Sequence, residues 1–168
     1  MQLIIVRHAI AEDREDFKKK SLDDRLRPLT LKGRKKMQKI AMEMREKIKD
    51  VELIITSPFT RAKQTAEILS QIFVDIPVVE APELTPQSPP AAFAKWLKSH
   101  AKDCKKIMAV GHEPHLSHLM SWFLSGSEEA FIELKKGGSG AIEFESFAEV
   151  RANAGHLLWL LQPKHWDE

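Results

Sequence analysis

Leu3-Ile4-Ile5-Val6-Arg7-His8 joins a run of large aliphatic residues directly to two cationic side chains. Apolar residues at consecutive positions, with no polar alternation, predict a strand that is covered on both faces. Runs of the same kind follow at Leu53-Ile54-Ile55 and at Ile107-Met108-Ala109-Val110. Because strands covered on both faces are typical of parallel sheets, these runs predict a mostly parallel sheet with helices on both sides.

Amphipathic stretches separate these runs. Helical spacing predicts a helix over residues 31–49 and a second that starts at Ser57-Pro58, with Ser57 as the cap, and continues to Phe73. The other expected elements are short helices over 93–101 and after Pro114, a strand at Val78-Val79, loops over 82–90 and 136–140, and two antiparallel final strands at 141–147 and 157–161. The predicted fold class is α/β, a three-layer α/β/α sandwich with a mostly parallel central sheet.

Length and composition limit the classes of protein to which the chain can belong. Its 168 residues fit a single domain over 1–168, and 43% hydrophobic residues supply one sizeable core. No stretch approaches the roughly 20 apolar residues that a membrane span needs. The single Cys104 excludes an internal disulfide, and the apolar run at residues 3–6 is too short, and lacks the basic lead, to be expected to act as a secretory signal. We therefore expect a cytoplasmic protein that does not associate with membranes.

The net charge of +2 is unevenly distributed along the chain. Residues 1–50 hold 15 Lys/Arg and 9 Asp/Glu, a net of +6, whereas the remainder holds 11 and 15, a net of −4. Lys18-Lys19-Lys20 and the segment 32–36 carry much of the excess. These lysines form either a solvated loop and helix face or a field that steers an anionic substrate. Nucleic-acid binding is not expected, because no aromatic residues interleave with the lysines.

Cationic residues follow the predicted strands at the edge where ligands bind in such sheets. Arg7 and His8 end the first strand, and Arg61 lies one turn into the helix after the second. His112 follows the strand that ends at Val110. Two arginines and two histidines can therefore meet at one edge of the sheet. Cations at strand ends and helix starts suit a phosphate group.

Four segments, in the same order along the chain, resemble the histidine phosphatase superfamily, which includes the cofactor-dependent phosphoglycerate mutases. They are Val6-Arg7-His8-Ala9, Leu29-Thr30-Leu31-Lys32-Gly33, the stretch Ser57 to Glu67 (Ser-Pro-x-x-Arg-Ala-x-Gln-Thr-Ala-Glu) and Val110-Gly111-His112-Glu113-Pro114. The short length, Pro28-Leu29-Thr30 and Glu83-Leu84-Thr85-Pro86 resemble the SixA-type phosphohistidine phosphatases within it. The resemblance implies a phosphoglycerate-mutase-like fold.

The same resemblance implies roles for four residues. His8 would attack phosphorus and become transiently phosphorylated, and water would then release inorganic phosphate. Arg7, Arg61 and His112 would bind the phosphoryl oxygens. No cofactor or metal is implied. The implied substrate is a signalling phosphoprotein that carries phosphohistidine, and we expect the enzyme to act as a monomer.

Elementary chemistry supports these roles. A nucleophilic imidazole must be neutral, and free histidine titrates near pH 6.5. The guanidinium groups of Arg7 and Arg61 should lower the pKa of His8 and stabilise charge on the phosphoryl oxygens. His112 would act best protonated, a state that an approaching phosphate dianion favours by raising its pKa.

Several positions depart from the family pattern or extend it. Ala9 replaces the glycine of the Arg-His-Gly motif, and alanine disfavours positive φ. Pro86 stands where many relatives carry a carboxylate general acid, and Glu83 is a nearby candidate that lies out of register. A missing general acid favours phosphohistidine, because an imidazole leaving group needs less proton donation than an alkoxide. Arg27 either lines the pocket or forms a structural or surface ion pair.

Three alternatives remain open. A metal could bind His112, His115 and His118, but their spacing is not His-Glu-x-x-His, so His115 and His118 are expected to be structural or exposed. A non-catalytic phosphoprotein-binding module would keep the arginines and would not need His8. A small-molecule phosphomonoester phosphatase of the same superfamily would use the same site, whereas mutase activity is not expected without larger insertions.

Overall fold

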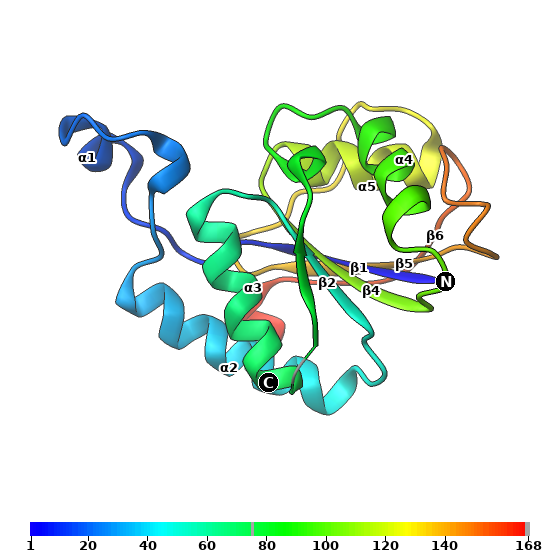
Figure 1. Cartoon of the computed structure of the whole chain (residues 1–168), viewed down its shortest axis with the longest axis horizontal. Helices are drawn as coiled ribbons and strands as arrows, with labels where there is room; N and C mark the ends of the chain where they lie inside the picture. The colour runs from blue at the N-terminus through cyan, green and yellow to red at the C-terminus, as the bar shows by residue number, and fades with distance from the viewer. Residues whose placement is uncertain (75, 167–168) are drawn as a thin grey trace.

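A computed structural model describes residues 1–74 and 76–166, which form a six-stranded sheet with helices on both faces (Figure 1). The strands are β1 (Gln2–Arg7), β2 (Leu53–Thr56), β3 (Val78–Glu80), β4 (Lys106–Gly111), β5 (Ser139–Glu143) and β6 (His156–Leu161). The α-helices are α1 (Arg14–Lys19), α2 (Leu31–Lys47), α3 (Thr60–Phe73), α4 (Pro90–His100) and α5 (His115–Ser125). Three short 3-10 helices are η1 (Asp24–Leu26), η2 (Pro82–Leu84) and η3 (Pro163–His165).

The strand order in the sheet is β3-β2-β4-β1-β5-β6. Three pairs are parallel: β1 with β4, β2 with β4 and β2 with β3. Strand β5 pairs antiparallel with β1, and β6 pairs antiparallel with β5. The predictions of a mostly parallel sheet and of two antiparallel final strands are therefore confirmed. No helix in the described part of the chain is long and apolar enough to cross a bilayer.

Side chains of β1 alternate between two cores, one on each face of the sheet. Ile4 and Val6 pack with residues of α2 and α3, whereas Leu3 and Ile5 pack with residues of α4 and α5. Full burial of each such side chain contributes roughly 1.5–3 kcal/mol to folding. Figure 1 shows α2 and α3 below the sheet and α4 and α5 above it. This arrangement confirms the predicted three layers.

Helix α2 begins against the segment that follows the first strand. The Thr30 side chain caps it by accepting a hydrogen bond of 2.9 Å from the Gly33 amide. A Cβ atom on Gly33 would lie 2.1 Å from the Ile10 carbonyl oxygen. Only glycine therefore lets α2 approach the backbone two residues beyond His8, which gives the Leu-Thr-x-x-Gly segment a structural cause.

Some predicted boundaries are wrong. Helix α3 starts at Thr60 with Phe59 as its N-cap residue, not at Ser57-Pro58. The Ser57 hydroxyl instead forms a hydrogen bond with a side chain at the end of β4, so a tertiary contact overrides the local capping signal. Helix α4 begins at Pro90 rather than residue 93, and residues 82–84 of the predicted loop form a 3-10 turn.

The predicted bounds of α2 and of the last two strands also need correction. Helix α2 ends at Lys47, because Ile48 has extended φ and ψ angles. Strand β5 covers Ser139–Glu143 rather than 141–147, since Ser139 already pairs with Val6 of β1. Strand β6 begins at His156, one residue earlier than expected.

Candidate active site

Strand register brings His8 and His112 together. Arg7 of β1 pairs with Gly111 of β4 in parallel, so each histidine is the first residue beyond a paired end. The His8 amide donates to the Gly111 carbonyl at 3.0 Å, and the two imidazole centroids lie 5.1 Å apart. The main chain therefore fixes the histidine pair, as the rule about strand ends predicts.

Arg61 completes a buried trio with these histidines. It lies in the first turn of α3 and is 1% exposed. Its Nε donates to His8 Nε2 at 3.3 Å, and another guanidinium nitrogen donates to the Asp24 carbonyl at 2.9 Å. Burial lowers the pKa of Arg61 to about 10, and the negative charge of Asp24 opposes this shift. Arg61 therefore stays cationic at neutral pH.

The hydrogen bonds of His8 determine its tautomer. The Ala9 carbonyl can only accept, so the 2.7 Å contact shows that His8 Nδ1 carries the proton. A guanidinium nitrogen can only donate, so Nε2 presents its lone pair toward Arg61. His8 is 5% exposed. The arrangement gives a neutral imidazole whose Nε2 is available as a nucleophile.

Burial, more than the arginines, makes His8 neutral. Burial is the largest cause that lowers its pKa, to about 3, and the positive charges of Arg61, Arg7 and Arg27 add smaller effects. The hydrogen bond with the Ala9 carbonyl acts in the opposite direction. The predicted direction is confirmed, but the predicted main cause is wrong, because the imidazole is almost fully removed from water.

His112 is also neutral in this structure. Burial lowers its pKa to about 2, helped by the nearby His8 and Arg61. Its Nε2 lies 2.7 Å from Ser57 Oγ, and its buried Nδ1 has no hydrogen-bond partner within residues 1–74 and 76–166. The expected protonated state therefore differs from the one found here. It would need the negative charge of a phosphoryl group to raise the pKa.

Arg7 points from the end of β1 toward the loop before β5. One guanidinium nitrogen donates to the Leu134 carbonyl at 2.6 Å, while the buried Nε lacks a partner in the described part of the chain. The Arg7 carbonyl accepts a 3.1 Å hydrogen bond from Gly137. Arg7 thus acts on His8 through its charge, and a free Nε remains for an anion.

Arg27 and Asp24 form an ion pair beside the trio. Arg27 is 6% exposed, and its Nε donates to Asp24 Oδ1 at 2.8 Å. A second Arg27 nitrogen donates to the Glu12 carbonyl at 2.8 Å. Of the two roles expected for Arg27, the structure shows the ion pair, and its charge also lowers the pKa values of His8 and His112.

Asp24 is a site residue that sequence reasoning missed. Its carboxylate lies 3.2 Å from Arg61 as well as 2.8 Å from Arg27. Burial raises the pKa of Asp24, but the hydrogen bond from Arg27 and the charges of Arg61, Arg27 and Arg14 outweigh it, so the pKa is lowered. Asp24 is therefore ionised at neutral pH. The only signal in the sequence was its i,i+3 spacing to Arg27, which several surface acids share.

Thr65 and Gln64 of α3 hold two segments of main chain, one directly after β1 and one directly before α2. Thr65 Oγ1 accepts from the Ala9 amide at 3.1 Å and donates to the Arg61 carbonyl at 2.8 Å. Gln64 Oε1 accepts from the Leu29 amide at 2.8 Å. Ala9 is not among the residues with positive φ, so alanine replaces the family's glycine without strain.

The structure does not bring Glu83 into the trio. Glu83 lies on η2 with a buried Oε2 that lacks a hydrogen-bond partner among the described residues, so no hydrogen bond joins this atom to the histidines or Arg61. Pro86 lines a surface hollow of about 480 Å³ together with Asp24 and Phe59. The position of the missing carboxylate therefore lies at the rim of the site.

His115 and His118 have surroundings that differ from those of His8 and His112. His115 is 1% exposed, neither ring nitrogen has a partner in the described ranges, and burial lowers its pKa to about 4. His118 Nδ1 contacts the Glu128 carbonyl. Across residues 1–74 and 76–166, no group of three or more His, Cys, Asp or Glu side chains could hold a metal ion.

Comparisons with known proteins agree with this geometry. The family model described as histidine phosphatase superfamily (branch 1) matches residues 3–87. An uncharacterized protein of Picosynechococcus sp. (strain ATCC 27264 / PCC 7002 / PR-6) is 32% identical over 167 residues, 99% of this chain and 98% of that protein. Phosphohistidine phosphatase SixA of Escherichia coli (strain K12) is 24% identical and aligns over 86% of this chain and 92% of its own.

Solved structures share the fold at lower identity. The protein histidine phosphatase SixA complexed with tungstate has a TM-score of 0.81 at 22% identity, and the match covers 98% of this chain and 99% of that chain. Other structures with this phosphoglycerate-mutase-like fold are named as an α-ribazole phosphatase of Shigella flexneri and a mycobacterial glucosyl-3-phosphoglycerate phosphatase. The shared fold therefore accompanies more than one phosphorylated substrate.

Proposed function

Since this chain belongs to the histidine phosphatase superfamily, branch 1, we propose that it removes phosphate from phosphohistidine in a protein, with His8 as the nucleophile. One observation carries the proposal. The Nδ1 proton of His8 is held by the Ala9 carbonyl, so Nε2 keeps its lone pair beside the cationic Arg61. A neutral nucleophile next to a fixed cation is the arrangement that phosphoryl transfer requires.

The reaction proceeds in two displacements. In the first, the His8 Nε2 lone pair forms a bond to phosphorus while the bond from phosphorus to the substrate imidazole breaks. The leaving nitrogen keeps the electron pair and takes a proton from water. In the second, water attacks the phosphorus of phospho-His8, loses a proton and releases inorganic phosphate, and the electron pair returns to Nε2. Arg61, Arg7 and His112 stabilise the phosphoryl oxygens.

The charge state of Asp24 supports a P–N substrate over a P–O substrate. Asp24 is the carboxylate that the structure pairs with Arg61, and its lowered pKa leaves it without a proton to donate. The buried Oε2 of Glu83 has no hydrogen-bond partner among the described residues, and Pro86 occupies the position of the family's acid. An alkoxide leaving group would need a proton donor, whereas an imidazole can be protonated by water.

A substrate comparison tests the proposal. We expect a phosphohistidine protein to be hydrolysed with a higher kcat/KM than phosphoserine peptides or sugar phosphates. His8→Ala should abolish this activity and retain the far-UV circular dichroism spectrum. A trapped phosphoenzyme should be labile in acid and stable in base. Faster turnover of the esters, or full activity in His8→Ala, would reject the proposal.

A second candidate is a phosphatase of small phosphomonoesters. The α-ribazole and glucosyl-3-phosphoglycerate phosphatases of the same fold favour it. The ester arm of the same experiment decides between the two. A non-catalytic phosphoprotein-binding module would instead bind the phosphoprotein and hydrolyse neither substrate.

We place the proposed activity in the cytoplasm, since Cys104 is a free thiol.

A further inference from the structure

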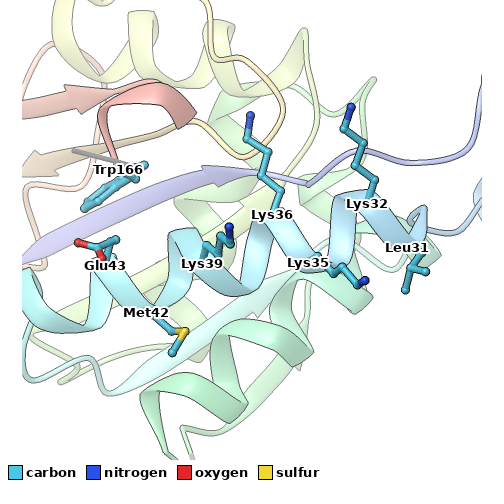
Figure 2. Close-up of a pocket in the computed structure, with 8 residues that line it drawn as sticks. All are labelled: Leu31, Lys32, Lys35, Lys36, Lys39, Met42, Glu43 and Trp166. Carbon is cyan, nitrogen blue, oxygen red and sulfur yellow. The ribbon is translucent and has the colours of Figure 1, made fainter.

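The exposed side of α2 carries a face of four lysines. Lys32, Lys35, Lys36 and Lys39 recur at i, i+3, i+4 and i+7, so they project from one side of the helix. With Trp166 they line a surface hollow of about 1000 Å³. Figure 2 shows Lys32 and Lys36 extending from α2 in the same direction. We call these four residues the lysine face.

Ion pairs within the described part of the chain do not stabilise the lysine face. Across residues 1–74 and 76–166, no ion pair joins any of its four members to a carboxylate. The first turn of α2 contains no acidic residue, and Lys32 lies within that turn. A cation near a helix N-terminus opposes the helix dipole and destabilises the helix. Neither ion pairing within the chain nor the helix dipole therefore accounts for the lysines on this face.

The lysine face is continuous with the candidate active site. Lys36 lines a second hollow, of about 550 Å³, together with Arg7. Lys135, Lys136 and Lys164 also line this second hollow. From Lys32 to Lys39 the helix rises by about 10 Å. An anionic segment lying along the lysine face would therefore lead directly to Arg7.

Apolar residues at the margin favour a protein as the occupant. Leu31 and Met42 also line the first hollow and are 70% and 57% exposed. They lie eleven residues apart, about three helical turns, so they share one edge of the lysine face. Figure 2 shows both pointing away from the side of Lys32 and Lys36. A segment with acidic and apolar residues would match both the lysine face and this apolar edge.

Other polyanions fit this surface less well. The Trp166 ring is 1% exposed, so it offers no face on which a nucleotide base could stack. The surface is hollowed, whereas a lipid headgroup layer is flat and needs a protruding helix with a broad apolar side. An acidic protein segment needs neither feature.

We propose that the lysine face is a docking site for an acidic segment of the phosphoprotein substrate, with Leu31 and Met42 contacting its apolar side chains. This inference rests on the proposed phosphohistidine phosphatase function. Docking would place the phosphorylated residue of the substrate near Arg7 by raising its local concentration. Charge complementarity would also speed the encounter at low salt.

Two synthetic phosphohistidine peptides of equal length test the docking site. One carries glutamates and leucines beside the phosphohistidine, and in the other each glutamate is replaced by glutamine. The wild type should hydrolyse the acidic peptide with a kcat/KM about tenfold higher, chiefly through KM. This preference should disappear in the triple variant K32Q/K35Q/K39Q and at about 0.5 M salt. Lys36 is left unchanged because it lines the hollow that contains Arg7.

The matched control is K95Q/K98Q/K102Q, which removes the same charge from and just beyond α4. It should keep the preference, and both triple variants should hydrolyse free phosphohistidine at the wild-type rate. Equal kcat/KM values for the two peptides, or the same loss in the α4 variant, would overturn docking at α2.

Binding to His8→Ala separates this inference from the proposed function. If the wild type hydrolyses neither peptide, the proposed function fails, but fluorescence anisotropy still reports docking. Tighter binding of the acidic peptide, lost on adding K32Q/K35Q/K39Q, would support the docking site. Equal binding of both peptides, or tighter binding of phosphatidylserine vesicles or a single-stranded oligonucleotide, would reject it.

Discussion

The Nε2 atom of His112 lies 2.7 Å from the hydroxyl oxygen of Ser57, across the adjacent ends of β4 and β2. Both side chains are at most 1% exposed. Ser57 follows Thr56, which pairs with Val110, so the register between β2 and β4 places this hydroxyl beside His112, as the register between β1 and β4 places His8. Ser57 thereby orients the imidazole that would meet the phosphoryl group.

Ser57→Ala should lower kcat/KM by about 5- to 150-fold. The substitution leaves a buried His112 nitrogen without its partner, which typically costs about 1–3 kcal/mol. Steady-state kinetics with a phosphohistidine peptide measures the effect. Ser99→Ala is the control, because Ser99 is exposed on α4 and should change kcat/KM by less than about twofold. An unchanged kcat/KM in Ser57→Ala would show that the hydroxyl does not orient His112.

Asp24→Asn should tighten the binding of inorganic phosphate by about 3- to 10-fold. Removing the carboxylate charge raises the positive potential at Arg61, while the Asp24 main-chain carbonyl still holds the guanidinium in place. Competitive inhibition by phosphate gives the dissociation constant. Asp23→Asn is the matched control, since Asp23 pairs with the exposed Arg25 and not with Arg61. Weaker phosphate binding in Asp24→Asn would contradict this account of the pocket charge.

The pH profile of kcat/KM should lack an acid limb near pH 6.5. A lowered histidine pKa keeps the imidazole neutral to lower pH, and the pKa of His8 is lowered to about 3. His8 should therefore stay nucleophilic from pH 7 to pH 5, whereas an imidazole of pKa 6.5 would be only about 3% neutral at pH 5. Hydrolysis of an aryl phosphate tests this, after correction for the substrate's own titration. An apparent pKa near 6.5 in the free enzyme would contradict the buried, neutral His8.

Gly33→Ala should destabilise the protein by about 1–3 kcal/mol. In an ordinary helix interior this change gains about 1 kcal/mol, but here the new Cβ would lie 2.1 Å from the Ile10 carbonyl oxygen. Urea denaturation measures the change in unfolding free energy. Gln38→Ala at an exposed position of α2 should alter stability by no more than about 0.5 kcal/mol. A stabilised Gly33→Ala variant would mean that α2 can move away from Ile10.

Local hydrophobic patterns in the sequence predict the main elements of the fold. Continuous apolar runs predicted the first, second and fourth strands, because a strand buried on both faces has no reason to alternate. The start of β5 was harder to predict, since Ser139 and Gly140 have low strand propensity. Gly140 packs closely against the Met120 side chain, since a Cβ there would lie 2.7 Å from its terminal methyl group, and this tertiary contact leaves no local signal.

The candidate site was predictable where residues follow strands and was missed where they depend on loops. His8, His112 and Arg61 lie at positions that the sheet topology determines. Asp24 comes from the η1 segment, whose position relative to α3 no local pattern reports. Ser57 was assigned to a helix cap because Ser-Pro is a strong local signal, and its contact with His112 depends on the pairing of β2 with β4.

The register between β1 and β4 has an evolutionary consequence. It arises from main-chain hydrogen bonds, which every residue type except proline can donate. Mutational drift can therefore exchange most side chains of the sheet without changing which residues emerge side by side at its edge. A single-residue insertion within β1 would instead shift the register with β4, and this shift would separate His8 from His112. Homologues should therefore differ at many side chains of these two strands but seldom in the length of either strand.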